Sequence, residues 1–143
     1  MIQDEIFSKL KRSLIKHESC EQFPYKDTFG NIGIGIGYNL SDRGLPMSWI
    51  DNQFKEDAEF FFDSLSKNYP FFCELNGDRQ IILVDMSFMG LKKIDEFTKM
   101  WEAIKNKDFS LASIEMLNSQ WAEQVKGRAV DLAYAMKSGV YDV

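Results

Sequence analysis

Two carboxylate side chains stand nine positions apart in contrasting surroundings. Glu18 ends a segment of helical periodicity, and Asp27 opens a glycine-rich stretch that continues to Tyr38. A pair of carboxyl groups can divide acid and base roles, because a protonated one donates to a leaving oxygen while an ionised one faces the reacting carbon or its water. Glycoside hydrolysis requires this division of roles.

The segment 4–18 is predicted to be an amphipathic helix. Its apolar residues recur at helical spacing, and Glu18 follows Leu14 by four residues, so it lies on the same stripe. A carboxyl group that faces a core loses water, which favours the protonated form that a general acid needs. The alternative, favoured by the helix pattern alone, is a helix-end glutamate paired with a nearby cation.

The glycine-rich stretch predicts a turn followed by a strand. Residues 28–31 have turn composition, and Gly30 is expected to supply the unusual backbone angle. Residues 32–38 alternate isoleucine and glycine, which predicts one strand with Gly33, Gly35 and Gly37 on a single face. Since glycine weakens a strand, the alternation indicates that another group approaches this face closely. The lysine and Ser/Thr of a phosphate-binding loop are absent.

Helical periodicity dominates the remainder of the chain, so the predicted fold class is α+β. We expect a single domain, 1–143, with a small antiparallel three-stranded sheet lobe at about 20–46. The larger helical lobe comprises 1–19 and about 68–143, and a long helix at about 47–67 joins the two. The N-terminal helix is expected to pack with the helical lobe, because its apolar stripe is too large for the small sheet to cover.

Composition narrows the classes of partner. The chain has 143 residues and a net charge of −5, which argues against a nucleic-acid partner. Its longest strongly apolar run, 81–84, is far too short to cross a membrane, and no secretory signal is visible. Cys20 and Cys73 are expected to be free thiols. With His17 as the single histidine and no close cysteine pair, no metal site is predicted.

The stretch from Glu18 to Gly37 resembles the phage-type lysozymes of glycoside hydrolase family 24. The family core Tyr-x-Asp-(Thr/Ser)-x-Gly, followed by Thr-Ile-Gly-x-Gly, coincides with Tyr25, Asp27, Thr28, Gly30, Ile34, Gly35 and Gly37. The resemblance continues through 85–90, which is similar to the buried central helix of the family. It extends to Phe97, Trp121 and 127–129, which are similar to its C-terminal helices.

The resemblance implies a muramidase that cuts peptidoglycan between N-acetylmuramic acid and N-acetylglucosamine without a metal or cofactor. Glu18 would be the general acid, Asp27 would orient the attacking water, and Arg128 would hold Glu18 in place. The supporting or substrate-binding positions would be Asn31, Gly33, Tyr38, Phe88 and Gln124, with Glu115 at a polar cleft position. A phage endolysin of this kind is expected to be a monomer that waits in the host cytoplasm until it is released to the cell wall.

Gly33 departs from the family pattern, because the catalytic threonine of the family falls on this position. Three outcomes stay open. In the first, Asn31 or a backbone group holds the water and the chain is a hydrolase. In the second, a hydroxyl of the sugar attacks in place of water and the chain is a lytic transglycosylase. In the third, the chain is a catalytically weak relative that binds the cell wall. A threonine side chain is expected to fit at residue 33 and to raise hydrolytic activity.

Overall fold

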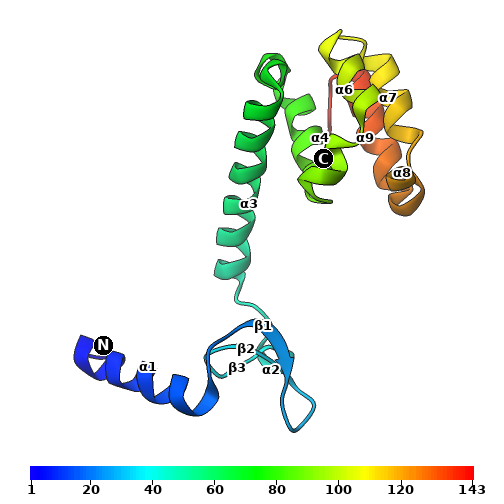
Figure 1. Cartoon of the computed structure of the whole chain (residues 1–143). Helices are drawn as coiled ribbons and strands as arrows, with labels where there is room; N and C mark the ends of the chain where they lie inside the picture. The colour runs from blue at the N-terminus through cyan, green and yellow to red at the C-terminus, as the bar shows by residue number, and fades with distance from the viewer. The chain divides into compact units, whose positions relative to one another are not determined.

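The computed structural model describes all residues, Met1–Val143, and confirms the α+β class. It contains nine α-helices, one short 3-10 helix and a three-stranded antiparallel sheet. The chain divides into two compact units, Met1–Gln53 and Phe54–Val143, called here the sheet unit and the helical unit. Figure 1 shows both, and each is described by itself.

The sheet unit begins with a long helix and continues into the sheet. Its elements are α1 (Asp4–Glu18), β1 (Glu21–Lys26), β2 (Ile32–Gly35), β3 (Tyr38–Asn39), α2 (Leu40–Arg43) and the first residues of α3 (Met47–Asn68). The strands pair in the order β1-β2-β3, with Tyr25 opposite Gly33 and Ile34 opposite Tyr38. The predicted helix 4–18 and the three-stranded antiparallel sheet are therefore confirmed.

The glycine-rich stretch is a hairpin, so the prediction of one strand over residues 32–38 is wrong. Strand β2 ends at Gly35, and β3 returns from Tyr38. Gly35 and Gly37 have φ of 66° and 63°, in the left-handed region that permits a tight reversal. An alternation of isoleucine and glycine matches a strand equally well, and only the backbone angles separate the two structures. The sequence also predicts a loop over residues 39–46, and the structure shows that this segment contains the short helix α2, whose first turn the Asn39 side chain caps.

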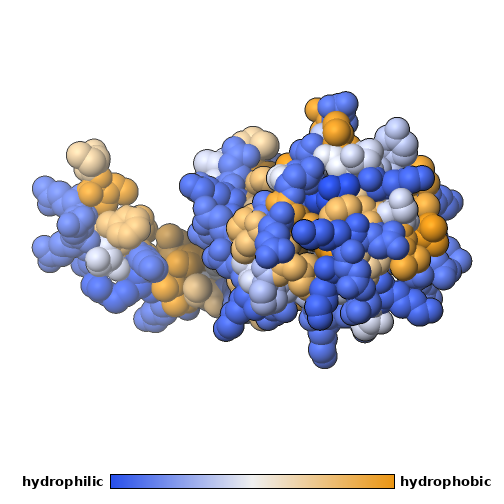
Figure 2. All heavy atoms as spheres, turned by 90° about the horizontal axis from the view of Figure 1, so that it is seen from above, coloured by the Kyte–Doolittle hydropathy of each residue, from blue (hydrophilic) through white to orange (hydrophobic).

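The apolar stripe of α1 has no cover within the sheet unit. Its large apolar side chains remain 39 to 57% exposed, and none is buried: Ile6, Phe7, Leu10 and Leu14. Figure 2 shows apolar residues exposed along this helix. The uncovered stripe agrees with the argument that the small sheet cannot bury it, and packing against the helical lobe stays a prediction.

The helical unit contains the remaining elements. After the greater part of α3 they are η1 (Pro70–Glu74), α4 (Gly77–Ser87), α5 (Leu91–Asp95), α6 (Thr98–Lys105), α7 (Phe109–Leu117), α8 (Gln120–Val125) and α9 (Gly127–Ser138). Apolar periodicity predicts helices over 79–89, 97–104, 110–117, 120–124 and 127–137. The bounds of α4 and α6–α9 lie within two residues of these ranges, whereas α5 was not predicted. No helix of the chain combines the length and apolar character that crossing a bilayer requires.

A single apolar core holds the helical unit together. Helix α7 packs against both α6 and α9, and α9 also packs against α4 and α8. The fully buried side chains include Leu83 and Met86 of α4, Met100 of α6, Met116 of α7 and Leu132 of α9. Gly139 ends α9 in a left-handed conformation with φ of 77°, as expected for a helix C-terminus.

Candidate functional site

Asp27 is held at the start of the turn between β1 and β2. Its Oδ1 accepts hydrogen bonds from the backbone N–H groups of Phe29 and Asn31, at 2.9 and 2.8 Å. The turn closes through the Asp27 N–H, which donates to the Asn31 carbonyl, while Gly30 adopts φ of 83° as predicted. One carboxylate oxygen thus fixes the turn, and no protein group bonds to the other. The side chain is exposed, so this second oxygen is open to a ligand or water.

Glu18 lies at the last position of α1, beside the hairpin. Its Cγ and carboxyl carbon lie 3.4 and 3.8 Å from where a Cβ on Gly37 would stand. Gly37 is therefore favoured by its left-handed backbone, and a Cβ at this position would be in ordinary van der Waals contact with Glu18. Within the sheet unit the Glu18 side chain is exposed and pairs with no cation, so this unit alone does not supply the desolvation expected for a general acid.

Gly33 is the buried centre of the sheet, and the ring of Tyr25 covers it. A Cβ at residue 33 would stand 2.8 Å from Tyr25 Cζ and 2.9 Å from its hydroxyl oxygen. These distances are shorter than van der Waals contact, so a threonine at residue 33 requires the Tyr25 ring to shift, and its fit and the gain in activity stay predictions. The φ of Gly33 is not in the left-handed region, which means that space and not backbone conformation excludes a side chain here.

Tyr38 and Asn31 have structural roles that the sequence did not indicate. The Tyr38 hydroxyl donates to the Gly44 carbonyl at 2.6 Å. Its ring lies 5.3 Å from that of Trp49, and the guanidinium of Arg43 covers it at 4.3 Å. Tyr38 therefore secures the segment after β3. Asn31 contributes its backbone to the Asp27 turn, which leaves its side-chain amide available for the supporting role predicted from the sequence.

In the helical unit, Arg128 forms an ion pair with Asp85. The Arg128 Nη2 and Nε donate to Asp85 Oδ1 at 2.6 and 3.1 Å, and Nη2 also reaches the Asp85 carbonyl at 3.3 Å. This pair joins the start of α9 to α4. The predicted contact of Arg128 with Glu18 would connect the two units, and it stays a prediction.

Phe88 packs at the end of α4 against α3. Its ring lies 4.8 Å from the Phe61 ring, edge to face, and 6.0 Å from the Phe54 ring, stacked. The side chain is nevertheless partly exposed, so one edge of this aromatic cluster remains accessible. The structure thus assigns Phe88 a packing role, and substrate contact by its exposed edge stays a prediction.

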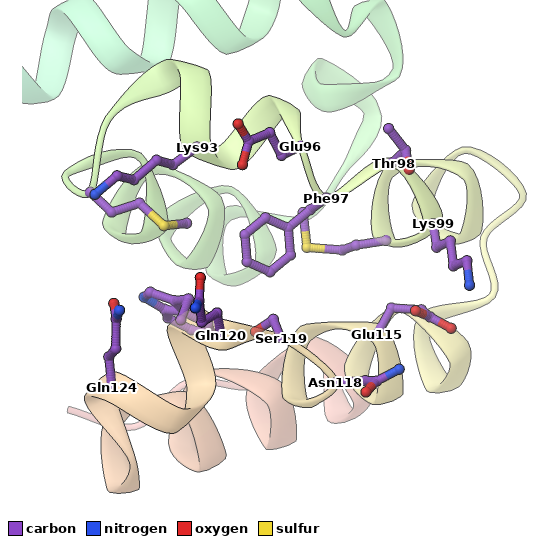
Figure 3. A pocket seen from close by; sticks show the side chains of 13 residues that line it. Lys93, Glu96, Phe97, Thr98, Lys99, Glu115, Asn118, Ser119, Gln120 and Gln124 are labelled. Carbon is purple, nitrogen blue, oxygen red and sulfur yellow. The ribbon is translucent and has the colours of Figure 1, made fainter.

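Gln124 lines a cavity of about 490 Å³ within the helical unit. Figure 3 shows Phe97 pointing into this cavity from the segment before α6, with Gln120 and Gln124 opposite on α8. Trp121 meets the Phe97 ring edge to face at 6.1 Å. Polar and charged side chains surround the two rings: Lys93, Glu96, Thr98, Lys99, Glu115, Asn118 and Ser119. Aromatic surface among amides, hydroxyls and charges of both signs suits a polar ligand with apolar parts.

Five predicted residues belong to the sheet unit: Glu18, Asp27, Asn31, Gly33 and Tyr38. Phe88, Gln124 and Arg128 belong to the helical unit. The sequence named Tyr25 only as part of the motif, and it missed the contact of its hydroxyl end with Gly33. An aromatic residue two positions before Asp27, opposite a bare glycine, was the signal that could have shown it.

The thiols and titratable side chains do not form a metal centre. No group of three or more histidine, cysteine, aspartate or glutamate side chains comes together in a way that could hold a metal ion. Cys20 and Cys73 are both exposed free thiols.

Comparison with known proteins shows a distant similarity to a protein named as a lysozyme. No family model matches it. The protein named "Probable T4-type lysozyme 2" of Dictyostelium discoideum is 23% identical over 159 aligned positions, which cover 90% of this chain and 94% of that protein. The similarity therefore extends well beyond the glycine-rich hairpin. It supports a lysozyme-type relationship, in agreement with the α+β fold of a small sheet and many helices.

Proposed function

We propose that the chain is a muramidase, which hydrolyses the bond between N-acetylmuramic acid and N-acetylglucosamine in peptidoglycan. Two carboxyl groups of the sheet unit that pair with no cation, Glu18 and Asp27, carry the proposal. Glu18 contacts the Gly37 position, and Asp27 keeps one oxygen free while its turn holds the other. The similarity to a T4-type lysozyme along nearly the full chain supports the same reading.

In this proposal Glu18 gives its proton to the glycosidic oxygen as the bond from that oxygen to the anomeric carbon breaks. A water molecule adds to the anomeric carbon, and its proton passes to the Asp27 carboxylate. The products are a free hydroxyl on the leaving sugar and a reducing end. Stabilisation of positive charge at the anomeric carbon by an ionised Asp27 is part of the same step.

The test is release of reducing ends from purified peptidoglycan by the wild type and by Glu18→Gln. Glutamine keeps the shape of the side chain and cannot supply a proton, so activity should fall by more than about tenfold, or about 1.4 kcal/mol in the barrier. Glu5→Gln, in the first turn of the same helix, is the matched control and should retain full activity. Glu18→Gln with a tenth or more of wild-type activity would exclude Glu18 as the acid.

Product analysis separates the reaction classes. Reducing ends identify a hydrolase, and anhydro sugars identify a lytic transglycosylase. Binding to peptidoglycan without release of either product identifies a wall-binding protein and refutes the proposed hydrolysis.

A further inference from the structure

Tyr25 carries a polar group that the fold does not use. Its side chain is half-buried, and its hydroxyl forms no hydrogen bond with any protein group. No buried side-chain oxygen or nitrogen of the chain lacks a partner, so this hydroxyl is in contact with solvent. A phenol held in place by packing, with an open hydroxyl, can donate one hydrogen bond and accept others.

The hydroxyl occupies the side-chain space of Gly33. Tyr25 and Gly33 are directly paired across β1 and β2, so their side chains belong to the same face of the sheet. The Tyr25 hydroxyl oxygen lies 2.9 Å from where a Cβ of Gly33 would stand. The bare glycine thus admits the end of the ring, which places a hydroxyl in the side-chain space of residue 33.

Asp27 is close to this hydroxyl along the chain. Tyr25 lies in β1, and Asp27 directly follows the last residue of this strand, with its N–H still paired to the Asn31 carbonyl. Extended residues two positions apart share a face, with Cα atoms about 7 Å apart. The turn holds Asp27 Oδ1, which leaves the second oxygen to face solvent. The phenol and this oxygen are therefore two polar groups near the end of β1 that are both open to solvent.

We infer that the Tyr25 hydroxyl, seated over Gly33, holds the attacking water beside Asp27. The phenol orients the water by a hydrogen bond, and Asp27 accepts the proton as in the proposed hydrolysis, on which this inference rests. The inference assigns Gly33 a steric role, since the glycine makes room for the hydroxyl of its cross-strand partner.

Tyr25 could instead have a purely structural role, because an aromatic ring over a cross-strand glycine stabilises a sheet. That role depends on the ring, whereas the inferred role depends on the hydroxyl. Tyr25→Phe keeps the ring and removes only the hydroxyl. Its kcat on purified peptidoglycan should fall about tenfold, with KM and the melting temperature unchanged, because the water loses its orientation. Tyr134→Phe removes a phenol that is 72% exposed on α9 and is the matched control, with no expected change.

The second test moves the hydroxyl from residue 25 of β1 to residue 33 of β2. Gly33→Thr alone should reduce activity, because its Cβ displaces the Tyr25 ring. In Tyr25→Ala the ring is gone, and adding Gly33→Thr should restore a hydroxyl from the opposite strand and raise kcat above that of Tyr25→Ala. Tyr25→Ala with Gly33→Val has the same shape without the hydroxyl, so it should match the threonine double variant in stability and remain at the low activity of Tyr25→Ala.

Three outcomes would contradict the inferred role of Tyr25. Tyr25→Phe with activity within about twofold of the wild type overturns it, and so do equal activities of the threonine and valine double variants. A wild type that releases no product from peptidoglycan refutes the proposed function itself, and the role of Tyr25 with it.

Discussion

The two units of the chain are held together by different means. All eighteen buried apolar side chains belong to the helical unit, from Leu65 to Met136. In the sheet unit Gly33 is the one buried residue, and it has no side chain to bury. The helical unit therefore depends on close packing, and the sheet unit depends on strand pairing, the Asp27 turn and contacts of aromatic rings with the backbone.

This difference in packing determines which unit can carry unpaired polar side chains for catalysis. A packed core excludes free polar groups, since each unpaired one costs free energy. In the sheet unit Glu18, Tyr25 and the second oxygen of Asp27 are all open to solvent. A unit with few buried contacts also unfolds locally at lower cost. We therefore expect faster amide hydrogen exchange in β1–β3 than in α4 and α9.

The largest effect should come from opening the core of the helical unit. Leu132 is fully buried in α9, so Leu132→Ala should lower the free energy of unfolding by about 3 kcal/mol. Phe29→Ala in the sheet unit removes a larger side chain that is 89% exposed, and its cost should be under about 0.5 kcal/mol. Urea unfolding of both variants is the measurement. A similar cost at both positions would show that the sheet unit has a core of its own.

A smaller effect is expected at Tyr69, which links η1 to α5 and α6. Its hydroxyl donates to Asp95 Oδ1 at 2.7 Å, and its ring stacks 3.6 Å from the Trp101 ring. Burial raises the pKa of Tyr69, and the hydrogen bond and charge of Asp95 raise it further. Tyr69→Phe should cost about 1 kcal/mol at pH 8, because the hydrogen bond is lost.

The pH dependence of the Tyr69 contribution follows from the raised pKa. The pKa of Tyr69 is higher in the folded state than its unfolded value of about 10. The contribution of Tyr69 to the free energy of unfolding is therefore complete below pH 10, and it is lost as the pH rises through the folded-state pKa. Unfolding measured from pH 8 to 11.5 should show wild type and Tyr69→Phe converging at the alkaline end. Parallel curves would contradict the assignment, and Tyr134→Phe is the control.

The smallest effect should be that of the Arg128–Asp85 pair. The two side chains are 50% and 31% exposed, so solvent screens their attraction and the pair should contribute under about 1 kcal/mol. A double-mutant cycle with Arg128→Ala and Asp85→Asn measures this coupling. If Arg128 also holds Glu18, Arg128→Ala should lower the proposed activity on peptidoglycan while Asp85→Asn retains it. Equal activity of the two variants would restrict Arg128 to the ion pair.

Patterns of apolar periodicity were sufficient to predict the α+β class and most helices. Helix α1 was predicted to the residue, and α9 to within one residue at its C-terminal end. The hairpin in the glycine stretch was not predicted, because strand alternation and a tight reversal use the same glycines. Gly35 pairs with Glu21 of β1, and Glu18 lies beside Gly37, so the reversal is seen only in contacts between segments.

The sequence by itself determined which residue types are available for chemistry and their order: an acid that ends a helix, a second acid that opens a turn, and a glycine where a hydroxyl was expected. Tertiary structure alone decided what fills the space above that glycine. Tyr25 and Gly33 are eight positions apart in the chain, and strand pairing places them face to face, with the phenol oxygen 2.9 Å from the missing Cβ. The physical reason is that a steric relation across two strands depends on their register, which local periodicity does not encode.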